Sequence, residues 1–306
     1  MASLLNALPG AVSQGLIWGI MAIGLYITYK LLDLSDLTVD GSFCTGGAVC
    51  VMAMLAGCNV WLAMLLAMIT GMIAGAVTGF FHTKCGIPAI LSGILTQLGL
   101  WSVNLAIMDM SATQRLDVSK FNVLVSLRFL KEVVKGEKPF FMHPIIVVAV
   151  VSAVVIGILY WFFGTELGCS LRATGSNPSM ARAQGINTNK CKIIGLMIAN
   201  GIVALSSAML AHYQGFVDVN MGRGAIVIGL AAVIISDVLF GKLFRNFALK
   251  LTGVAIGAVI YYIVIQVVLW LGLNTNLLKL LSALIVAVFL AVPHWKANMQ
   301  GGKGRA

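Results

Sequence analysis

Three polar side chains recur at helical spacing within an otherwise apolar stretch, residues 87–108. Gln97, Trp101 and Asn104 stand at positions i, i+4 and i+7, so they share one face of a helix. Thr96 lies beside that face. Amide and indole groups facing lipid would lack hydrogen-bond partners, which is costly, so we expect this face to point into the protein. Two interpretations stay open: the face lines a substrate route, or its polar groups bond to neighbouring helices.

A second polar group opens the second apolar segment of the chain. Asp40, Ser42 and Thr45 gather there among three glycines. A carboxylate at membrane depth is expensive and usually lines a cavity or pairs with a base. Half-helices whose ends point at a substrate are also a recurring device in transporters. The alternative is that Asp40 is an interfacial cap, because Asp33 and Asp36 nearby resemble ordinary interfacial charge.

A short helix with a signal at each end is predicted within the polar break 165–192. Asn177 can accept a backbone N–H as an N-cap. Pro178 suits the first helical position, because its missing N–H costs nothing there. Gly185 can adopt the left-handed conformation that ends a helix. A compact surface helix of this kind is suited to docking a soluble partner.

These polar groups must be positioned by membrane-spanning helices. The chain of 306 residues is 60% hydrophobic and 10% charged, with a mean hydropathy of +1.00, which is typical of a protein within a bilayer. One span needs about 20 apolar residues. We therefore expect about nine, at residues 14–32, 40–57, 60–80, 87–108, 143–164, 193–214, 224–240, 250–271 and 277–293.

The predicted fold class is an all-α polytopic membrane protein. The second, fourth and seventh segments are rich in Gly and small polar residues, so we expect them to be broken or re-entrant. No soluble domain and no long linker interrupts the segments, which favours a single transmembrane domain over residues 1–306.

Lys and Arg residues in the loops predict the orientation. They concentrate in residues 165–192, residues 241–250 and the C-terminal tail, and cytoplasmic loops carry the excess of such residues. The N-terminus is then outside and the C-terminus inside. Residues 109–142 disagree, because they carry six Lys and Arg residues yet are assigned outside; within them, 121–134 has the pattern of an amphipathic surface helix. Residues 1–13 carry neither Lys nor Arg, so we expect a lead-in to the first span rather than a cleaved signal.

Several other classes of site are disfavoured. The six cysteines form no CxxC pair, so we expect them to act as small apolar groups, and the four histidines are too scattered in sequence to indicate a metal site. The net charge of +10 comes from cations at span ends, where they meet anionic lipid, and does not indicate nucleic-acid binding. The chain has no GxxxxGK[ST] phosphate loop, so we do not expect it to hydrolyse ATP.

Glycines recur every four residues in two of the predicted spans. Gly71, Gly75 and Gly79 lie in the third, and Gly253 and Gly257 lie in the eighth. Such stripes let helices approach closely in lipid, where van der Waals contact drives association. We expect this packing to occur within one protomer rather than across a dimer seam.

Two stretches resemble a known family. Residues 171–187, LRATGSNPSMARAQGIN, are similar to the cytoplasmic coupling loop in permease subunits of ABC importers of the branched-chain amino acid and ribose type. Residues 31–43, LLDLSDLTVDGSF, resemble the start of the second span in the subgroup linked to tryptophan and tyrosine import. One departure is SDVLFGKLFRN, residues 236–246, where sugar and branched-chain members often carry a Gly-rich loop.

The resemblance implies the transmembrane subunit of an ATP-driven importer. It would work as a homodimer in the bacterial cytoplasmic membrane, with cytoplasmic ATPase subunits that bind ATP and magnesium and an external binding protein that delivers substrate. The chain itself would hold no cofactor and would not be an enzyme. Coupling to the ATPase would fall to residues of one cytoplasmic loop and its helix: Gly175, Asn177, Pro178, Ala181, Arg182, Gly185 and Ile186. An aromatic amino acid is the first expectation for the substrate, with a branched-chain amino acid or a small sugar as alternatives.

A stand-alone secondary transporter or channel is the rival class. It would need an ion-coupling carboxylate within the membrane, and Asp40 and Asp237 are the candidates. An intramembrane enzyme would need a nucleophile with a base, or a set of metal ligands, within the spans, and we find no convincing set.

Overall fold

The protein is described by a computed structural model that covers residues 2–118, 120–121, 123–129, 143–241, 243–244 and 246–271, with 280, 283–284, 286–288 and 291 near the C-terminus. The long helices are α1 (Ala2–Tyr26), α3 (Val60–Thr83), α4 (Ala89–Ile107), α6 (Pro144–Phe163), α9 (Thr188–Gln214) and α11 (Phe247–Trp270). The shorter elements are η1 (Ile27–Leu31), α2 (Val39–Leu55), α7 (Glu166–Ser176), α8 (Pro178–Ala183), α10 (Ala225–Phe240) and the strands β1 (Thr113–Arg115) and β2 (Phe216–Asp218).

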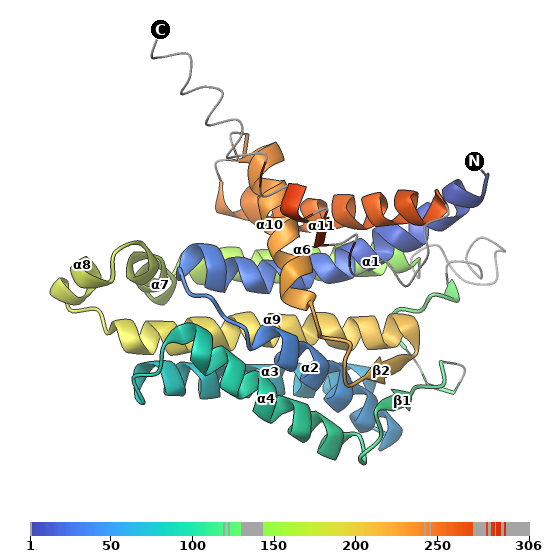
Figure 1. The fold of residues 1–306 in the computed structure, drawn as a ribbon, viewed down its shortest axis with the longest axis horizontal. Helices are drawn as coiled ribbons and strands as arrows, with labels where there is room; N and C mark the ends of the chain where they lie inside the picture. Colours follow the sequence, from blue (N-terminus) through green and yellow to red (C-terminus); the bar gives the residue numbers. More distant parts are fainter. Residues whose placement is uncertain are drawn as a thin grey trace, which may run out of the picture.

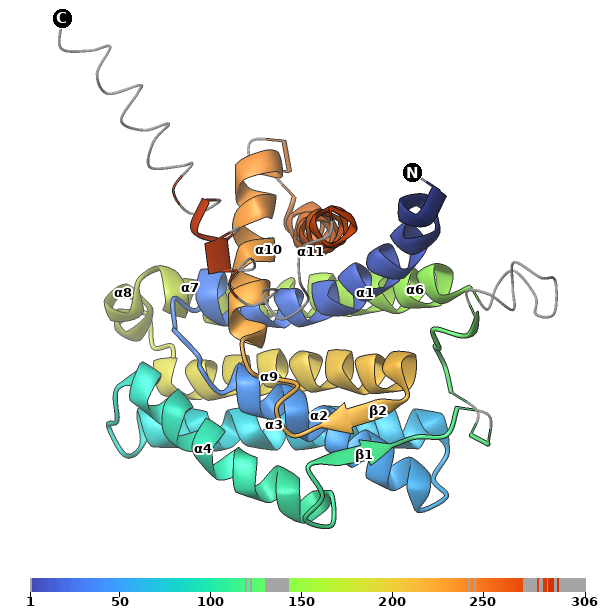
Figure 2. The ribbon, with the colours of Figure 1, turned by 45° about the vertical axis from the view of Figure 1, so that its right-hand side comes forward.

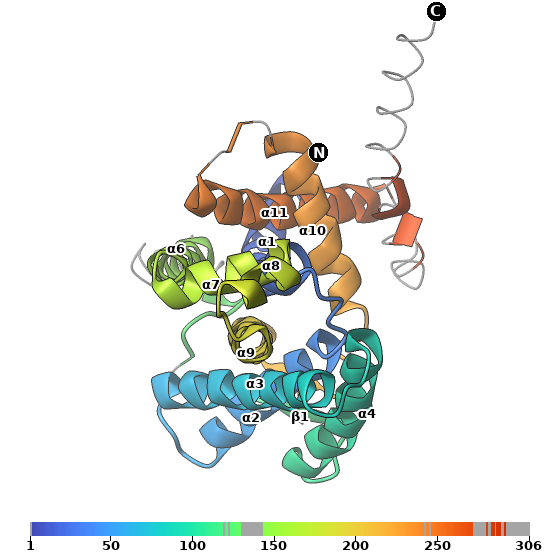
Figure 3. The same ribbon diagram turned by 90° about the vertical axis from the view of Figure 1, so that its left-hand side faces the viewer.

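Helix α9 forms the centre of the molecule. Figure 3 looks along α9 and shows it between α3 on one side and α1 on the other, with α6 beside α1. Because α1, α2 and α3 all pack on α9, its side chains are buried along most of its length. Helix α4 flanks α2 and α3, while α10 and α11 cover the far side of α1 (Figures 1 and 2).

Glycines bring these helices into close contact, as the sequence predicts. A Cβ atom at Gly71 would lie 2.4 Å from the carbonyl oxygen of Asn200 on α9, and one at Gly257 would lie 2.3 Å from that of Ala232 on α10. Neither distance leaves room for a side chain. Both glycine stripes therefore serve helix packing within the protomer, which confirms that prediction.

The number of spans agrees only in part with the predicted nine. In the described part of the chain, six helices are long and apolar enough to cross a membrane, and α2 and α10 are shorter apolar helices. The second and seventh segments, predicted to be broken or re-entrant, form the continuous but short helices α2 and α10, of 17 and 16 residues. The fourth segment, with the same prediction, forms α4, which runs unbroken over 19 residues. Most of the ninth segment, 277–293, lies outside the described residues.

A small β-sheet is an addition to the all-α prediction. Strands β1 and β2 pair antiparallel, with Thr113 opposite Asp218 and Arg115 opposite Phe216. The hydroxyl of Thr113 also donates to Oδ2 of Asp218 at 2.6 Å. The two strands are about a hundred residues apart in sequence, and the pair joins the segment after α4 to the segment after α9.

The predicted surface helix over residues 121–134 is wrong for its first half. Residues 121 and 123–128 form turns and irregular backbone, residue 129 is helical, and residues 130–142 lie outside the described part. The backbone N–H of Leu127 bonds to the carbonyl of Tyr213 at 3.1 Å, at the end of α9. The side chains of Val125 and Phe129 are buried. These two side chains thus pack on the helix bundle, while Leu127 is exposed.

Candidate functional site

Four of the seven predicted pathway residues line one hollow between α2, α4 and the start of α10. Asp40, Gln97, Trp101 and Asn104 line this space, which has a volume of about 320 Å³. The side chain of Trp101 is 43% exposed, whereas that of Asn104 is 1% exposed. The shared face of α4 predicted from the i, i+4, i+7 spacing therefore does border a cavity, with the amide of Asn104 at its buried end. We call this space the α2–α4 hollow.

Asp40 caps a helix other than its own. Helix α10 begins after Gly224, which has a φ of +88°, and its first N–H groups have no partner within the helix. The carboxylate of Asp40 accepts the N–H of Gly224 on Oδ2 and the N–H of Ile226 on Oδ1, both at 3.0 Å. A carboxylate is favourable at this positive helix end. Asp40 therefore borders the cavity and also acts as a cap, but the cap belongs to α10 rather than to the membrane interface.

The other three predicted pathway residues lie away from this hollow. The hydroxyl of Ser42 donates to Oδ1 of Asn200 at 2.6 Å inside the core. Thr45 bonds to the carbonyl of Gly41 at 3.0 Å, and Thr96 accepts a hydrogen bond from Thr78 at 2.9 Å. Thr45 and Thr96 border a separate, mostly apolar space of about 460 Å³ between α3 and α4.

Asp36 is a buried structural residue, so its interpretation as interfacial charge is wrong. It is 2% exposed. Its Oδ1 accepts the N–H of Thr38 at 2.9 Å and its Oδ2 accepts Nδ2 of Asn200 at 2.7 Å. The hydrogen bond from the backbone N–H of Thr38 to the side chain of Asp36, two residues earlier, closes an Asx-turn. The sequence pattern Asp-x-Thr is a recognisable signal for this turn. Asn200 joins Asp36 to Ser42, so the polar positions of α9 serve helix–helix bonding here.

Arg223 is a lining residue of the α2–α4 hollow that the sequence interpretation missed. It lies just before α10, and its side chain is exposed. The hollow is lined by one acidic and one basic side chain, Asp40 and Arg223, beside the apolar Leu98 and Val219. A Gly-Arg-Gly run at the start of a short apolar helix is the signal that could have indicated it.

The short helix α8 has the predicted caps. Oδ1 of Asn177 accepts the N–H of Met180 at 3.0 Å, and Pro178 occupies the first turn. Gly185 has a φ of +82°, and the N–H of Ile186 bonds back to the carbonyl of Ala181 at 3.0 Å. In Figure 1, α7 and α8 project at one end of the molecule, opposite the β1–β2 pair.

The residues assigned to coupling do not all face outward. Asn177, Arg182 and Gly185 are exposed, while Ala181 is buried. Gly175 packs against η1, because a Cβ there would lie 1.8 Å from the carbonyl oxygen of Leu31. Gly175 and Ala181 therefore hold the α7–α8 unit on the bundle, and the exposed residues present its outer surface.

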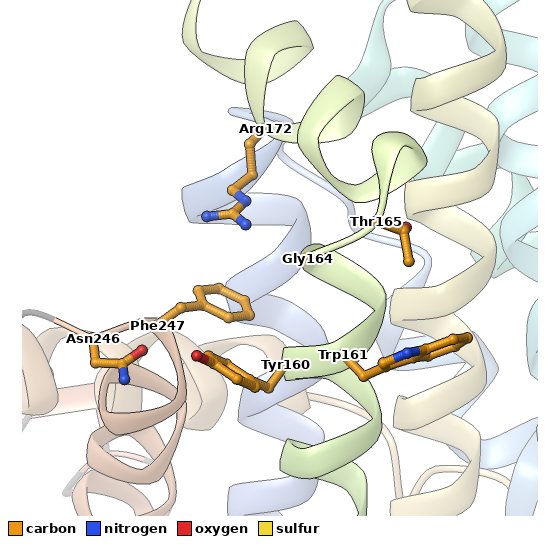
Figure 4. A pocket seen from close by; sticks show the side chains of 7 residues that line it. All are labelled: Tyr160, Trp161, Gly164, Thr165, Arg172, Asn246 and Phe247. Carbon is orange, nitrogen blue, oxygen red and sulfur yellow. The ribbon is translucent and has the colours of Figure 1, made fainter.

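A pocket at the junction of α6, α7 and α11 shows how α7 is anchored (Figure 4). The pocket has a volume of about 560 Å³, and Tyr160 and Trp161 line its α6 side. The guanidinium of Arg172 lies 5.3 Å from the centre of the Phe247 ring of α11 and donates a hydrogen bond to the carbonyl of Phe163. Arg172 thus connects α7 to the ends of both neighbouring helices.

The second candidate carboxylate for ion coupling is paired. Asp237 on α10 accepts Nζ of Lys30 at 2.7 Å, and both side chains are partly exposed. Within the described residues, no group of three or more His, Cys, Asp and Glu side chains is arranged to hold a metal ion.

The chain is similar to known transport proteins over nearly its whole length. The family model described as "Branched-chain amino acid transport system / permease component" matches residues 8–292. A tyrosine transport system permease protein of Clostridioides difficile is 37% identical over 97% of this chain and 94% of its own. The ribose import permease RbsC of Escherichia coli strain K12 is 23% identical over 95% of this chain and 87% of its own.

A solved structure shares the fold. PsaBC from Streptococcus pneumoniae in complex with Fab aligns with a TM-score of 0.50 and 16% identity, covering 94% of this chain and 89% of that one. The resemblance inferred from residues 31–43 and 171–187 is confirmed by the family match and by the tyrosine permease relative. The chain therefore belongs to the permease component family of branched-chain amino acid transport systems, as the permease subunit of an ABC transporter.

Proposed function

We propose that this chain forms the translocation path of an ATP-driven importer for an amino acid, most simply an aromatic one. Two copies would form the path, and an external binding protein would deliver the substrate. ATP and magnesium would bind in cytoplasmic partner subunits, so the chain would carry no cofactor and no ATPase activity of its own. The name of the 37% identical relative supports an amino acid, while the more distant ribose permease keeps a sugar as the alternative.

The α2–α4 hollow carries the assignment of the path. Its wall combines the half-exposed ring of Trp101, the buried amide of Asn104 and the cap Asp40. The amide Nδ2 of Asn104 lies 3.4 Å from the carbonyl of Gly41, and its Oδ1 is buried without a partner among the described residues. Most buried polar atoms have a hydrogen-bond partner, and this unpartnered acceptor belongs to a residue that lines a cavity, so the arrangement supports a ligand-facing role.

Changes at Trp101 and Asn104 are expected to reduce transport without reducing stability. Trp101→Ala removes a half-exposed ring, and Asn104→Leu removes a poorly satisfied amide, so each should change the melting temperature by less than about 3 °C. Uptake by the reconstituted importer should fall about tenfold or more, because each variant alters the wall of the path. The measurement is uptake per folded complex beside thermal melting in detergent. Lower melting temperatures with normal turnover per folded complex would instead give these residues a structural role.

The α7–α8 unit is proposed to dock on the ATPase and to transmit its movement. Its two helices project from the bundle, and Met180 is 63% exposed at the tip. Arg172 and Gly175 fix the base of the unit to α6, α11 and η1. A rigid base with an exposed tip suits a contact that must transfer a displacement rather than absorb it.

Gly185→Val is expected to uncouple ATP hydrolysis from uptake. A Cβ at Gly185 would meet nothing within 4 Å, so valine would not clash with a neighbour there. The destabilisation comes instead from the positive φ, because the left-handed conformation costs most L-residues about 1–2 kcal/mol. Relief of that strain would unwind the end of α8. Stimulation of ATPase activity by the loaded binding protein should then be largely lost in proteoliposomes. The matched control is Gly185→Asn, since Asn tolerates this conformation and should keep most of the stimulation; equal behaviour of both variants would contradict the idea.

The α7–α8 end is proposed to face the cytoplasm and the β1–β2 end the outside, which places the N-terminus outside and the C-terminus inside. Exposed positions at the two ends are Ser179 and Ala112. In a background without reactive thiols, Ala112→Cys should react with an impermeant maleimide in intact cells and Ser179→Cys only after permeabilisation. The opposite labelling pattern would overturn both the orientation and the docking role of α8.

A stand-alone secondary transporter is the weaker reading of the same structure. Of the two carboxylates proposed for ion coupling, Asp237 is paired with Lys30, and each oxygen of Asp40 already accepts one backbone N–H at the start of α10. Uptake by the purified chain alone, driven by a proton or sodium gradient, would favour that class. Uptake that requires ATP and the partner subunits supports the importer.

A further inference from the structure

We infer that the α2–α4 hollow recognises the charged backbone of a free amino acid, with Asp40 receiving the ammonium group and Arg223 the carboxylate. This inference rests on the proposed function and names the chemistry of the same site. A zwitterion carries one positive and one negative group. The lining of the hollow contains one acidic and one basic side chain, so it can offer an opposite charge to each.

Arg223 is placed to donate hydrogen bonds to a carboxylate. Among the described residues its guanidinium forms no ion pair and no side-chain hydrogen bond. A guanidinium has five N–H donors in a planar fork that matches a carboxylate. The start of α10, which could otherwise attract an anion, is already occupied by Asp40. Arg223 is therefore the group in this hollow that remains available for a negative charge.

Asp40 and Asn104 together offer acceptors for an ammonium group. Each carboxylate oxygen of Asp40 accepts one backbone N–H and retains a further lone pair. Oδ1 of Asn104 is buried and has no donor in the part of the chain that the structure describes, which is costly unless a ligand supplies one. An ammonium group has three donors and no acceptor. It can satisfy these oxygens without displacing the cap on α10.

The remaining wall suits an apolar or aromatic side chain. Trp101 is 43% exposed and Leu98 is 65% exposed, and both line the hollow beside the charged pair. An indole face gives a stacking surface for another ring. A neutral sugar would leave the guanidinium of Arg223 without a charged partner, and a metal cation would meet its positive charge. The composition of the site therefore favours an amino acid over either.

The test uses the complete importer in lipid nanodiscs, with Gln97→Cys as a reporter inside the hollow and the native reactive thiols replaced. Protection of this thiol from a small maleimide is measured with three probes: tyrosine, tyramine, which lacks the carboxylate, and 3-(4-hydroxyphenyl)propionate, which lacks the ammonium group. Tyrosine should protect at a concentration at least about tenfold lower than either fragment, because each fragment forfeits one charge-assisted contact.

Substitution of Arg223 then separates recognition from a structural effect. In Arg223→Gln, tyrosine and tyramine should protect equally, while the difference between tyrosine and the propionate should persist. Arg223→Lys should retain part of the preference for tyrosine over tyramine, because it keeps the charge but not the fork. A merely structural role would weaken all three probes together and would not remove one difference selectively.

The outcomes distinguish this inference from the proposed function. Equal protection by all three probes, or an unchanged preference in Arg223→Gln, would overturn the zwitterion site. ATP-dependent uptake of an amino acid by the same complex would then still support the importer. If the complex takes up a sugar and no amino acid, the proposed substrate class and the zwitterion site both fail.

Discussion

Replacing Gly75 by leucine is expected to prevent normal assembly of the bundle. Helix α3 crosses α9 so closely that a Cβ at Gly75 would lie 2.2 Å from the carbonyl oxygen of Leu196 and 2.9 Å from the backbone nitrogen of Met197. Both atoms belong to the backbone of the central helix, so no rotamer change can relieve the overlap. Overpacking costs about 1–3 kcal/mol where neighbours can move and more where they cannot. We expect a loss of at least about 3 kcal/mol, seen as poor recovery of monodisperse protein and a much lower melting temperature.

The matched control is the same change on the outer helix, Gly99→Leu. A Cβ at Gly99 of α4 would meet nothing within 4 Å, and leucine is a better helix former than glycine by about 0.8 kcal/mol. Its melting temperature should be unchanged or slightly raised. If both variants lose stability equally, glycine at these positions serves some general need of membrane insertion rather than the contact between α3 and α9.

The spans were predictable because their signal is local. A run of apolar residues of sufficient length reports a buried or lipid-facing helix wherever it lies in the chain, and eight of the predicted segments correspond to helices in the described part. The caps of α8 were predictable for the same reason, since Asn177 and Gly185 act on backbone groups within a few residues. The pairing of β1 with β2 was not, because each strand has only three residues and its partner lies about a hundred residues away.

The candidate site was predictable only in part. Helical spacing correctly placed Gln97, Trp101 and Asn104 on one face, since that face is a property of α4 alone. The roles of Asp40 and Arg223 depend on how the start of α10 docks on α2. Periodicity within one segment carries no information about such a contact. The sequence therefore indicates where polar groups lie along each helix, whereas the fold determines which of them share a cavity.

The α9 positions Asn200 and Ser207 show the same limit, and they lead to the second large effect. Both residues are polar and lie seven positions apart, so the sequence alone does not distinguish their roles. Both are fully buried, but their hydrogen bonds differ. Asn200 donates to Asp36 at 2.7 Å and accepts from Ser42 at 2.6 Å, whereas the hydroxyl of Ser207 has no hydrogen-bond partner within the described ranges.

Asn200→Leu is therefore expected to be strongly destabilising. The buried carboxyl group of Asp36 then keeps its hydrogen bond from Thr38 but loses the one from Asn200. Ser42 loses the shorter of its two side-chain hydrogen bonds. Leaving a buried hydrogen-bonding group without its partner costs about 1–3 kcal/mol, and more if the group is charged, because the remaining group stays away from water without compensation. The purified protein should melt well below the wild type and should aggregate on mild heating.

Ser207→Ala is the control that decides whether this loss comes from the network or from any polar change on α9. It removes a hydroxyl that has no partner, so its melting temperature should stay the same or rise slightly. A double change, Asp36→Leu with Asn200→Leu, gives a second check. Replacing both partners by apolar groups of similar size removes the uncompensated charge, so it should recover part of the stability lost in Asn200→Leu alone. If the double variant is worse by the full sum of the single losses, Asp36 and Asn200 act independently, and the hydrogen bond between them does not hold α9 to the start of α2.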